Sequence, residues 1–329
     1  MQKSLDRKLA ELRANPGGPA FILADAKDAD MAWGAASPGV RWPNDGTGRF
    51  ISMQEFRDQI REIVRLGLVD IMLGSVATMD ELAGHEKLFA DSPVTPAVRA
   101  NDATDVWCMR GASYRTRPSR PFAGADLAEV QEAGVNLGLY SATFVNDLEA
   151  DLRSLEAFKT FRLDARRRGF RYFLEVFEPN VDTGLAPEAV PTFINDHISH
   201  ALAAVPRDSR PDFLKIPYLG ARALEELVNY DTGVIVGILG GGSGTTLDAF
   251  QLLHDAQKHG ARVALFGRKI KDAEHPVTFI RHLWHIVSDG LAPVEAVKSY
   301  HAELARLKLA SKRTLADDLQ RTNTLLAYS

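Results

Sequence analysis

The sequence predicts a (β/α)8 barrel of the TIM type, an α/β fold formed by residues 1–329 as a single domain. Eight short apolar runs recur along the chain, and segments with helical periodicity lie between them. Strands that alternate with helices form a parallel sheet covered on its faces, and eight of them favour a closed barrel. The predicted strands are residues 20–25, 69–76, 95–101, 135–144, 171–177, 213–217, 233–239 and 262–267.

The segments between these strands show helix signals. Residues 52–66, 147–168 and 246–260 have apolar side chains at three- and four-residue spacing. Capping boxes precede two of them, Ser52-x-x-Glu55 and Thr245-x-x-Asp248. Residues 1–19 form an N-terminal extension with an amphipathic helix, whose apolar face carries Leu5, Leu9 and Leu12. Residues 102–124, rich in Pro, Gly and Arg, predict a long loop after the third strand.

Composition limits the possible partners and compartments. The net charge of −4 argues against nucleic acid or an acidic membrane surface as a partner. One cysteine, Cys108, excludes an internal disulfide and is typical of a reducing cytosol. No apolar run is long enough to span a bilayer, and the N-terminus lacks the apolar core of a signal peptide. We therefore expect a soluble cytoplasmic homo-oligomer, with the N-terminal helix and residues 300–319 as candidate interfaces.

Lys215 is the strongest chemical signal. In such barrels the active site lies at the carboxyl ends of the strands. Lys215 sits in the apolar run 213–217, where strand alternation puts it on the same face as Phe213. Burial favours the neutral form of an amine, and a neutral lysine attacks ketones to form an imine. The alternative is a lysine that reaches the barrel rim and pairs with a carboxylate.

Two carboxylates accompany this lysine. Glu175 shares a strand face with Phe173 and Phe177, where it must be paired, protonated or functional. It suits a general acid/base, although a purely structural ion pair with Lys215 would give the same pattern. Asp25 ends the first apolar run, where it either positions Lys215 or substrate, or caps the next segment.

The loops after the last two strands predict an anion site. Gly241, Gly242 and Ser243 lie in a glycine run that leads into a helix, and Gly267 with Arg268 follows the eighth strand. Glycines permit close backbone approach, and free amides at a helix N-terminus attract anions. Barrels often bind phosphate between these two loops. The run matches no nucleotide motif and the histidines show no metal-ligand spacing, so we expect neither cofactor nor metal.

Together these segments resemble the class I (Schiff-base) aldolases of the tagatose-bisphosphate and sulfofructose-phosphate type. More distantly they are similar to archaeal-type fructose-bisphosphate aldolase. The resemblance runs from Leu23-Ala24-Asp25 through Phe173-Leu174-Glu175 and Leu214-Lys215-Ile216 to Gly267-Arg268. It implies a Schiff-base lysine at Lys215, a proton-transferring glutamate at Glu175, an active-site aspartate at Asp25, and phosphate binding by Gly241, Gly242, Gly267 and Arg268.

The chain departs from that pattern at two strands. The tagatose-bisphosphate group carries a lysine on the fourth strand, about where Asn136 stands here, and an aspartate–glutamine pair where this chain has Asp25-Ala26. These departures suggest a different substrate, for example one with a single anionic group. Further candidate site residues are Lys27, Tyr140, Tyr218 and Asn136.

The expected function is reversible carbon–carbon cleavage of a ketose phosphate or similar anionic hydroxyketone. Lys215 would form the imine, Glu175 would move the hydroxyl proton, and the imine would replace a metal as electron sink. Two alternatives stay open. One is a thiolase-like acyl transferase that uses the same lysine, and the other is a non-catalytic sugar-phosphate binder.

Overall fold

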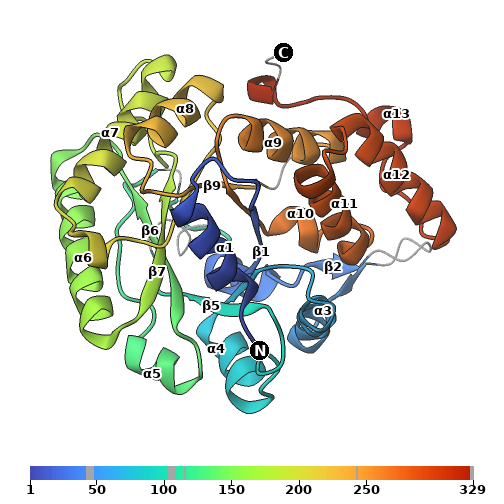
Figure 1. Cartoon of the computed structure of the whole chain (residues 1–329), viewed down its shortest axis with the longest axis horizontal. Coiled ribbons are helices and arrows are strands. Elements are labelled where there is room, and N and C mark those ends of the chain that lie inside the picture. Colours follow the sequence, from blue (N-terminus) through green and yellow to red (C-terminus); the bar gives the residue numbers. More distant parts are fainter. Residues whose placement is uncertain (42–47, 103–108, 115, 242–243, 327–329) are drawn as a thin grey trace.

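All eight predicted strands are present, and they close into a parallel barrel (Figure 1). The computed structural model describes residues 1–41, 48–102, 109–114, 116–241 and 244–326, so Cys108 lies outside the described residues. The barrel order is β1-β10-β9-β8-β7-β6-β5-β4. The strands are β1 (Ile22–Lys27), β4 (Ile71–Gly74), β5 (Thr95–Arg99), β6 (Leu137–Thr143), β7 (Arg171–Phe177), β8 (Leu214–Ile216), β9 (Val236–Leu239) and β10 (Val263–Phe266). The predicted (β/α)8 class is therefore confirmed.

Helices surround the strands and follow the predicted signals. Ser52 caps α3 with the capping box expected from Glu55, and Thr245 caps α9 in the same way with Asp248. An additional antiparallel ribbon, β2 (Val40–Arg41) with β3 (Arg49–Phe50), lies between β1 and α3. The helices are α1 (Ser4–Ala14), α2 (Ala29–Trp33), α3 (Met53–Arg65), α4 (Val76–Met79), α5 (Leu127–Glu132), α6 (Leu148–Arg168), α7 (Val190–Ala203), α8 (Ala221–Tyr230), α9 (Thr246–Lys258), α10 (Arg268–Lys271), α11 (Pro276–Asp289), α12 (Pro293–Arg306) and α13 (Leu315–Asp318).

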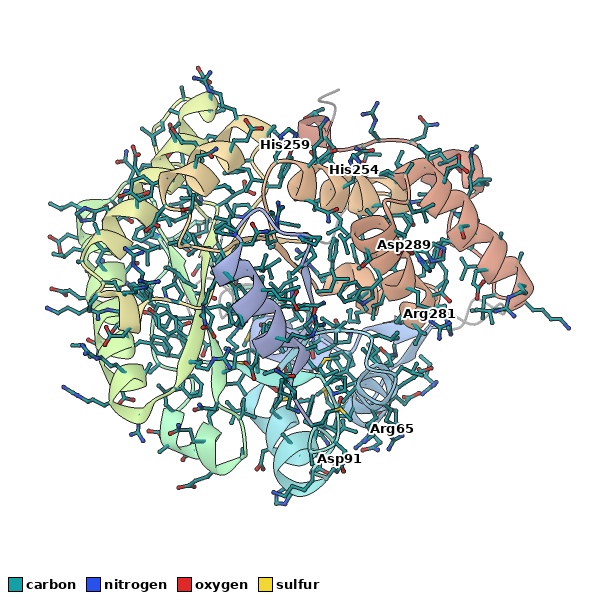
Figure 2. All side chains as sticks on the ribbon, in the orientation of Figure 1. Arg65, Asp91, His254, His259, Arg281 and Asp289 are labelled. Carbon is teal, nitrogen blue, oxygen red and sulfur yellow. The ribbon has the colours of Figure 1, made fainter. Side chains whose placement is uncertain are left out.

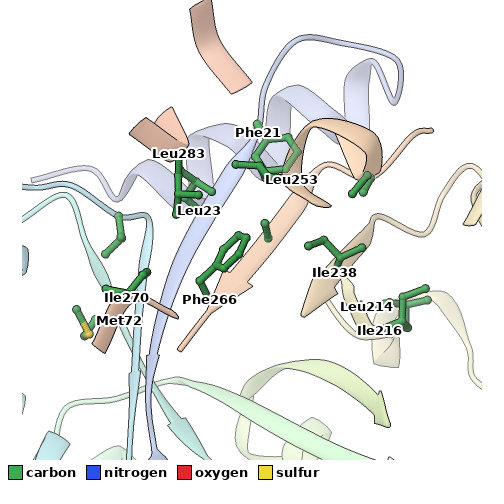
Figure 3. Close-up of a cluster of buried hydrophobic side chains, with 14 of the residues drawn as sticks. Phe21, Leu23, Met72, Leu214, Ile216, Ile238, Leu253, Phe266, Ile270 and Leu283 are labelled. Carbon is green, nitrogen blue, oxygen red and sulfur yellow. The ribbon is translucent and has the colours of Figure 1, made fainter. Parts of the chain in front are cut away.

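The buried apolar side chains form two clusters, one on each face of the barrel strands. The inner cluster contains the inward-facing residues of the barrel, among them Ile22, Ala24, Phe173 and Phe213. The outer cluster lies between strands and helices, and Figure 3 shows part of it around Leu23, Met72 and Phe266. Because successive strand residues alternate between these clusters, membership of a cluster tells which way each neighbouring polar side chain points.

Helix α1 closes the amino-terminal end of the barrel. Its residues Leu5, Leu9 and Leu12 join the inner cluster, and Figure 1 shows the helix across the barrel centre. Lys8 pairs with Asp70 just before β4 at 2.8 Å. Ser4 donates its amide to the carbonyl of Pro93, shortly before β5. The barrel interior is therefore sealed at this end.

The outer surface is polar. Figure 2 shows charged side chains such as Arg65, Asp91 and Asp289 pointing away from the helical layer. No helix within the described ranges combines the length and apolar character needed to cross a membrane.

Candidate active site

Three polar side chains form one row across the inner face of the barrel. In the parallel register, Ser141 of β6 pairs with Glu175 of β7, and Glu175 pairs with Lys215 of β8. Phe173 and Phe213 belong to the inner cluster, and each lies two residues before one of the charged residues. Glu175 and Lys215 therefore point into the barrel, as the alternation predicted.

The Lys215 ammonium contacts Glu175 directly. Its Nζ forms an ion pair with Oε1 of Glu175, and the side chains are only 8% and 1% exposed. The other carboxylate oxygen, Oε2, accepts a hydrogen bond from the Ser141 hydroxyl at 2.9 Å. Arg99 of β5 lies on the same oxygen at 3.4 Å and donates to Ser141 Oγ at 2.8 Å. Both oxygens of Glu175 are thus held, and its orientation is fixed.

Asp28 completes the charged network. It follows β1 directly, and its carboxylate accepts a hydrogen bond from Arg99 Nε at 2.6 Å. Burial acts to raise the pKa of Asp28, but the charges of Arg99 and Lys215 outweigh it and lower that pKa. Among the described residues, two cations and two anions therefore pair on the floor of the barrel mouth. Arg99 and Asp28 were not among the site residues expected from the sequence; the arginine two residues after Ala97, on the inner face, was the signal for Arg99.

Asp25 and Lys27 do not lie in this network, contrary to the expectation from the sequence. Ile22 and Ala24 face the barrel interior, so Asp25 and Lys27 point toward the surrounding helices. There they form a fully buried ion pair, with Lys27 Nζ 2.8 Å from Asp25 Oδ2. Burial raises the pKa of Asp25 despite this partner. The aspartate beside the lysine is Asp28.

Three further candidates lie elsewhere. Asn136 precedes β6 at the amino-terminal end of the barrel, where it is exposed and donates to the Gly169 carbonyl. Ser141 occupies the inner position beside Glu175 instead. Tyr140 points outward into the helical layer, where its ring stacks on Phe161. Tyr218 is buried in the same outer cluster.

A cavity of about 390 Å³ opens above the charged network at the carboxyl ends of the strands. Lys215, Glu175, Asp28 and Arg99 line its floor. Its walls contain the remaining described members of the predicted anion site and a lysine of α10, namely Gly241, Gly267, Arg268 and Lys271. Gly242 and Ser243 lie outside the described residues. The cavity thus joins the lysine to both loops.

Close packing explains the glycine at position 267. A Cβ atom there would lie 2.9 Å from the carbonyl oxygen of Ala26, which also lines the cavity. Gly241 has a φ of +56°, a conformation that other residues rarely adopt. At both positions, therefore, the backbone itself borders the cavity.

The helix after the glycine run already holds anions of the chain itself. The amide of Thr246 donates to Asp318 of α13 at 2.7 Å, and the amide of Thr245 donates to Asp248 at 2.8 Å. These two amides of α9 are therefore occupied, which corrects the expectation that they are free for a ligand. Arg268 and Lys271 line the cavity, and Lys271 Nζ also donates to the carbonyl of Ser37 at 3.2 Å and pairs with Asp272 at 3.2 Å.

Within the described part of the chain, no group of three or more His, Cys, Asp or Glu side chains is arranged to hold a metal ion. The charged side chains on the cavity floor instead pair with one another.

No protein-family model matches the sequence, and no curated protein matches it. Solved structures do match the fold. An archaeal fructose 1,6-bisphosphate aldolase gives a TM-score of 0.63 at 16% identity, over 87% of this chain and 100% of that chain. The fructose-bisphosphate aldolase from Slackia heliotrinireducens gives 0.64 at 18% identity, over 91% of each chain. A third structure, an archaeal fructose-1,6-bisphosphate aldolase with its catalytic lysine covalently bound to the carbinolamine intermediate, gives 0.62 at 16% identity. At these identities the likeness establishes one thing: the chain shares the (β/α)8 barrel of these aldolases.

Proposed function

We propose that this protein is a class I aldolase that cleaves a ketose phosphate, or a similar anionic hydroxyketone, through an imine at Lys215. One observation carries the proposal. A buried lysine amine touches a buried glutamate on the floor of a cavity whose walls carry two further cations. The fold neighbours that are described as Schiff-base-forming fructose-1,6-bisphosphate aldolases support it.

Imine formation needs a neutral amine and a proton carrier. Glu175 takes a proton from Lys215, with which it is in contact, as the carbonyl substrate enters. The free amine adds to the ketone carbon and gives a carbinolamine. Glu175 returns the proton to the carbinolamine hydroxyl, which leaves as water, and a positively charged imine remains.

Cleavage uses the same glutamate in the opposite direction. As a carboxylate again, Glu175 accepts the proton of the hydroxyl on the carbon β to the imine carbon. The C–C bond then breaks, an aldehyde leaves, and the electron pair moves to the imine nitrogen to form an enamine. Protonation of the enamine carbon and hydrolysis release the second carbonyl product and Lys215. Because the imine takes up the electron pair, the steps use no metal ion.

Three neighbours keep Glu175 and Lys215 in place. Ser141 and Arg99 contact Oε2 of Glu175, the carboxylate oxygen that faces away from the lysine. The other oxygen, Oε1, therefore stays in contact with Nζ of Lys215. Asp28 balances the charge of Arg99, which prevents a net positive charge that would oppose formation of the cationic imine. We assign Asp28 the positioning role that the resemblance gave to Asp25.

The substrate anion would bind at the cavity wall. Arg268 and Lys271 supply positive charge, and the backbone at Gly241 and Gly267 permits close approach. We propose one anionic group, because the tagatose-bisphosphate group carries a lysine on its fourth strand, whereas β6 contains none and has Ser141 beside Glu175. The single cysteine supports a cytoplasmic location for this reaction.

Borohydride reduction with a panel of ketose phosphates, followed by mass spectrometry of the Lys215 peptide, tests the proposal. The parent protein should gain a reduced adduct on Lys215 and release an aldehyde without borohydride. Lys215→Ala should give neither, whereas Lys258→Ala, which changes an exposed lysine of α9, should behave as the parent. Glu175→Gln should lower turnover by roughly 10²–10⁴-fold.

The proposal fails if Lys215→Ala retains turnover, or if the parent forms no adduct with any ketose phosphate. An adduct on Lys215 without release of an aldehyde would favour the acyl-transferase alternative.

A further inference from the structure

A second cavity lies at the opposite end of the barrel. Its volume is about 880 Å³, against about 390 Å³ for the candidate active site. Its walls come from the end of α6, from the end of α1, and from the residues that precede β7, β8 and β9. Measured along strand β7 (Arg171–Phe177), the two ends of the barrel lie roughly 20 Å apart. The second cavity is therefore distinct from the candidate active site.

Positive charge gathers in this cavity although the chain carries a net charge of −4. Three aspartates line it: Asp208, Asp212 and Asp231. Six arginines oppose them: Arg13, Arg162, Arg166, Arg171, Arg207 and Arg210.

The aspartates are already engaged. Asp212 pairs with Arg13 at 2.7 Å and with Arg171 at 2.8 Å. Asp231 pairs with Arg210 at 2.7 Å, and Arg166 contacts Asp208 at 3.1 Å. Arg171 also pairs with Asp6 at 2.7 Å, so the remaining positive charge belongs to Arg162 and Arg207, which form no ion pair with a described residue.

Arg162 is the critical residue. It lies on the buried face of α6 and is only 8% exposed, yet no described residue forms a hydrogen bond or ion pair with its guanidinium. It adjoins Tyr172 of β7, whose hydroxyl is already donated to the carbonyl of Ser209. The nitrogens of Arg162 are not enclosed by protein, so the guanidinium faces the cavity with its donors unused. A recessed guanidinium without a counterion attracts an anion more strongly than one at the open surface.

We infer that this cavity is a binding site for a small organic phosphate. A guanidinium offers a planar fork of donors that matches phosphate oxygens, and Arg162, Arg166 and Arg207 all line the cavity. Phe170 and Pro211 supply an apolar wall for the organic part. The volume lies in the range of small-molecule sites, and the recessed position of Arg162 favours a small ligand over a macromolecule.

The inference is independent of the proposed function, so the two fail separately. Calorimetric titration with inorganic pyrophosphate and with glycerol 3-phosphate is carried out on the full chain. A background variant, Arg268→Met with Lys271→Met, removes the two cations on the walls of the other cavity, where Arg99 and Lys215 remain paired with carboxylates. Binding should persist in this background and should weaken at least about tenfold when Arg162→Met is added.

Thermal stability without ligand gives a second readout. Arg162→Met retains an apolar chain of similar length and breaks no ion pair among the described residues, so the melting temperature without ligand should stay within about 2 °C of the parent. Pyrophosphate should then raise it less than in the parent. An equal rise in parent and variant would contradict a role of Arg162 in binding.

Arg207→Gln covers the case in which Arg162→Met does not fold. Arg207 is exposed, so the parent melting temperature should be retained and phosphate binding should weaken several-fold. Unchanged affinity in Arg162→Met overturns the inference, as does the absence of phosphate binding in the Arg268/Lys271 background. If Arg162→Met does not fold, unchanged phosphate affinity in Arg207→Gln overturns the inference.

Discussion

The Arg99–Asp28 pair gives the sharpest test of the charged network. Arg99 and Asp28 are 3% and 8% exposed, and their side chains meet at 2.6 Å. Replacement of Arg99 by Met leaves Asp28 and Glu175 facing Lys215 alone. Breaking a buried pair from one side costs about 3–5 kcal/mol. For 329 residues, 1 kcal/mol corresponds to about 1.5 °C, so the melting temperature should fall by about 4–7 °C.

A double-mutant cycle separates the pair from the packing of the two side chains. Asp28→Asn alone should also cost about 3–5 kcal/mol, because it leaves Arg99 and Lys215 facing one carboxylate. The double variant Arg99→Met/Asp28→Asn restores the charge balance. It should be more stable than the sum of the single effects by about 2 kcal/mol. Urea unfolding of the four proteins measures this coupling.

Arg153→Met, at an exposed ion pair of α6, is the matched control and should stay within about 0.5 kcal/mol of the parent. Strictly additive single effects would refute the argument, because they would mean that Arg99 and Asp28 do not stabilise one another.

Three other substitutions test how the fold supports the site. Asp318→Ala should destabilise the protein by about 2 kcal/mol at pH 7, since it removes the acceptor for the Thr246 amide. Burial acts to raise the pKa of Asp318, but that hydrogen bond and others hold the pKa below its usual value. The stability difference between the parent and Asp318→Ala should therefore shrink below about pH 4 in melting experiments. Gly240→Ala should cost about 1–3 kcal/mol in urea unfolding, because its Cβ would lie 2.1 Å from the Phe266 ring. Asp147→Ala should cost about 1 kcal/mol in the same assay, because Asp147 caps α6.

Each substitution has a control in the same part of the chain. Asp317→Ala, beside Asp318 on α13, should destabilise the protein less, since Asp317 is exposed and accepts a hydrogen bond only from the Thr314 hydroxyl among the described residues. Gly17→Ala should be tolerated, since the nearest atom to its Cβ would be 3.8 Å away. Glu156→Ala, at an exposed position within α6, should leave stability near that of the parent. If a control matches its test variant, the contact assigned to that test residue does not stabilise the fold.

Alternation along the strands made much of the architecture predictable. The apolar runs identified all eight strands, and the position of Lys215 two residues after Phe213 predicted its inward direction correctly. Glu175 was predicted on the same grounds. Their contact follows because β7 and β8 are neighbours with these residues in register.

The prediction from sequence was wrong for polar residues near the ends of strands, where the placement of a side chain depends on the strand's exact bounds. Strand β1 continues to Lys27, and its alternation with Ala24 puts Asp25 on the outer face, so Asp28 is the first acidic residue of this segment at the barrel mouth. Asn136 precedes β6 and therefore lies at the wrong end of the barrel. Arg99 was missed although it lies two residues after Ala97 on the inner face, because an arginine at a strand end is usually exposed.

Pairing of β1 with β10 has a consequence for synthesis on the ribosome. Ile22 meets Val263 in the register, so roughly 240 residues must follow β1 before its second neighbour exists. At 5–20 residues per second, that interval lasts about 12–50 s. During it, one edge of the nascent sheet has unpaired backbone groups, a state that promotes aggregation. Slowing translation after β9 should therefore lengthen chaperone association, whereas slowing it after β10 should not.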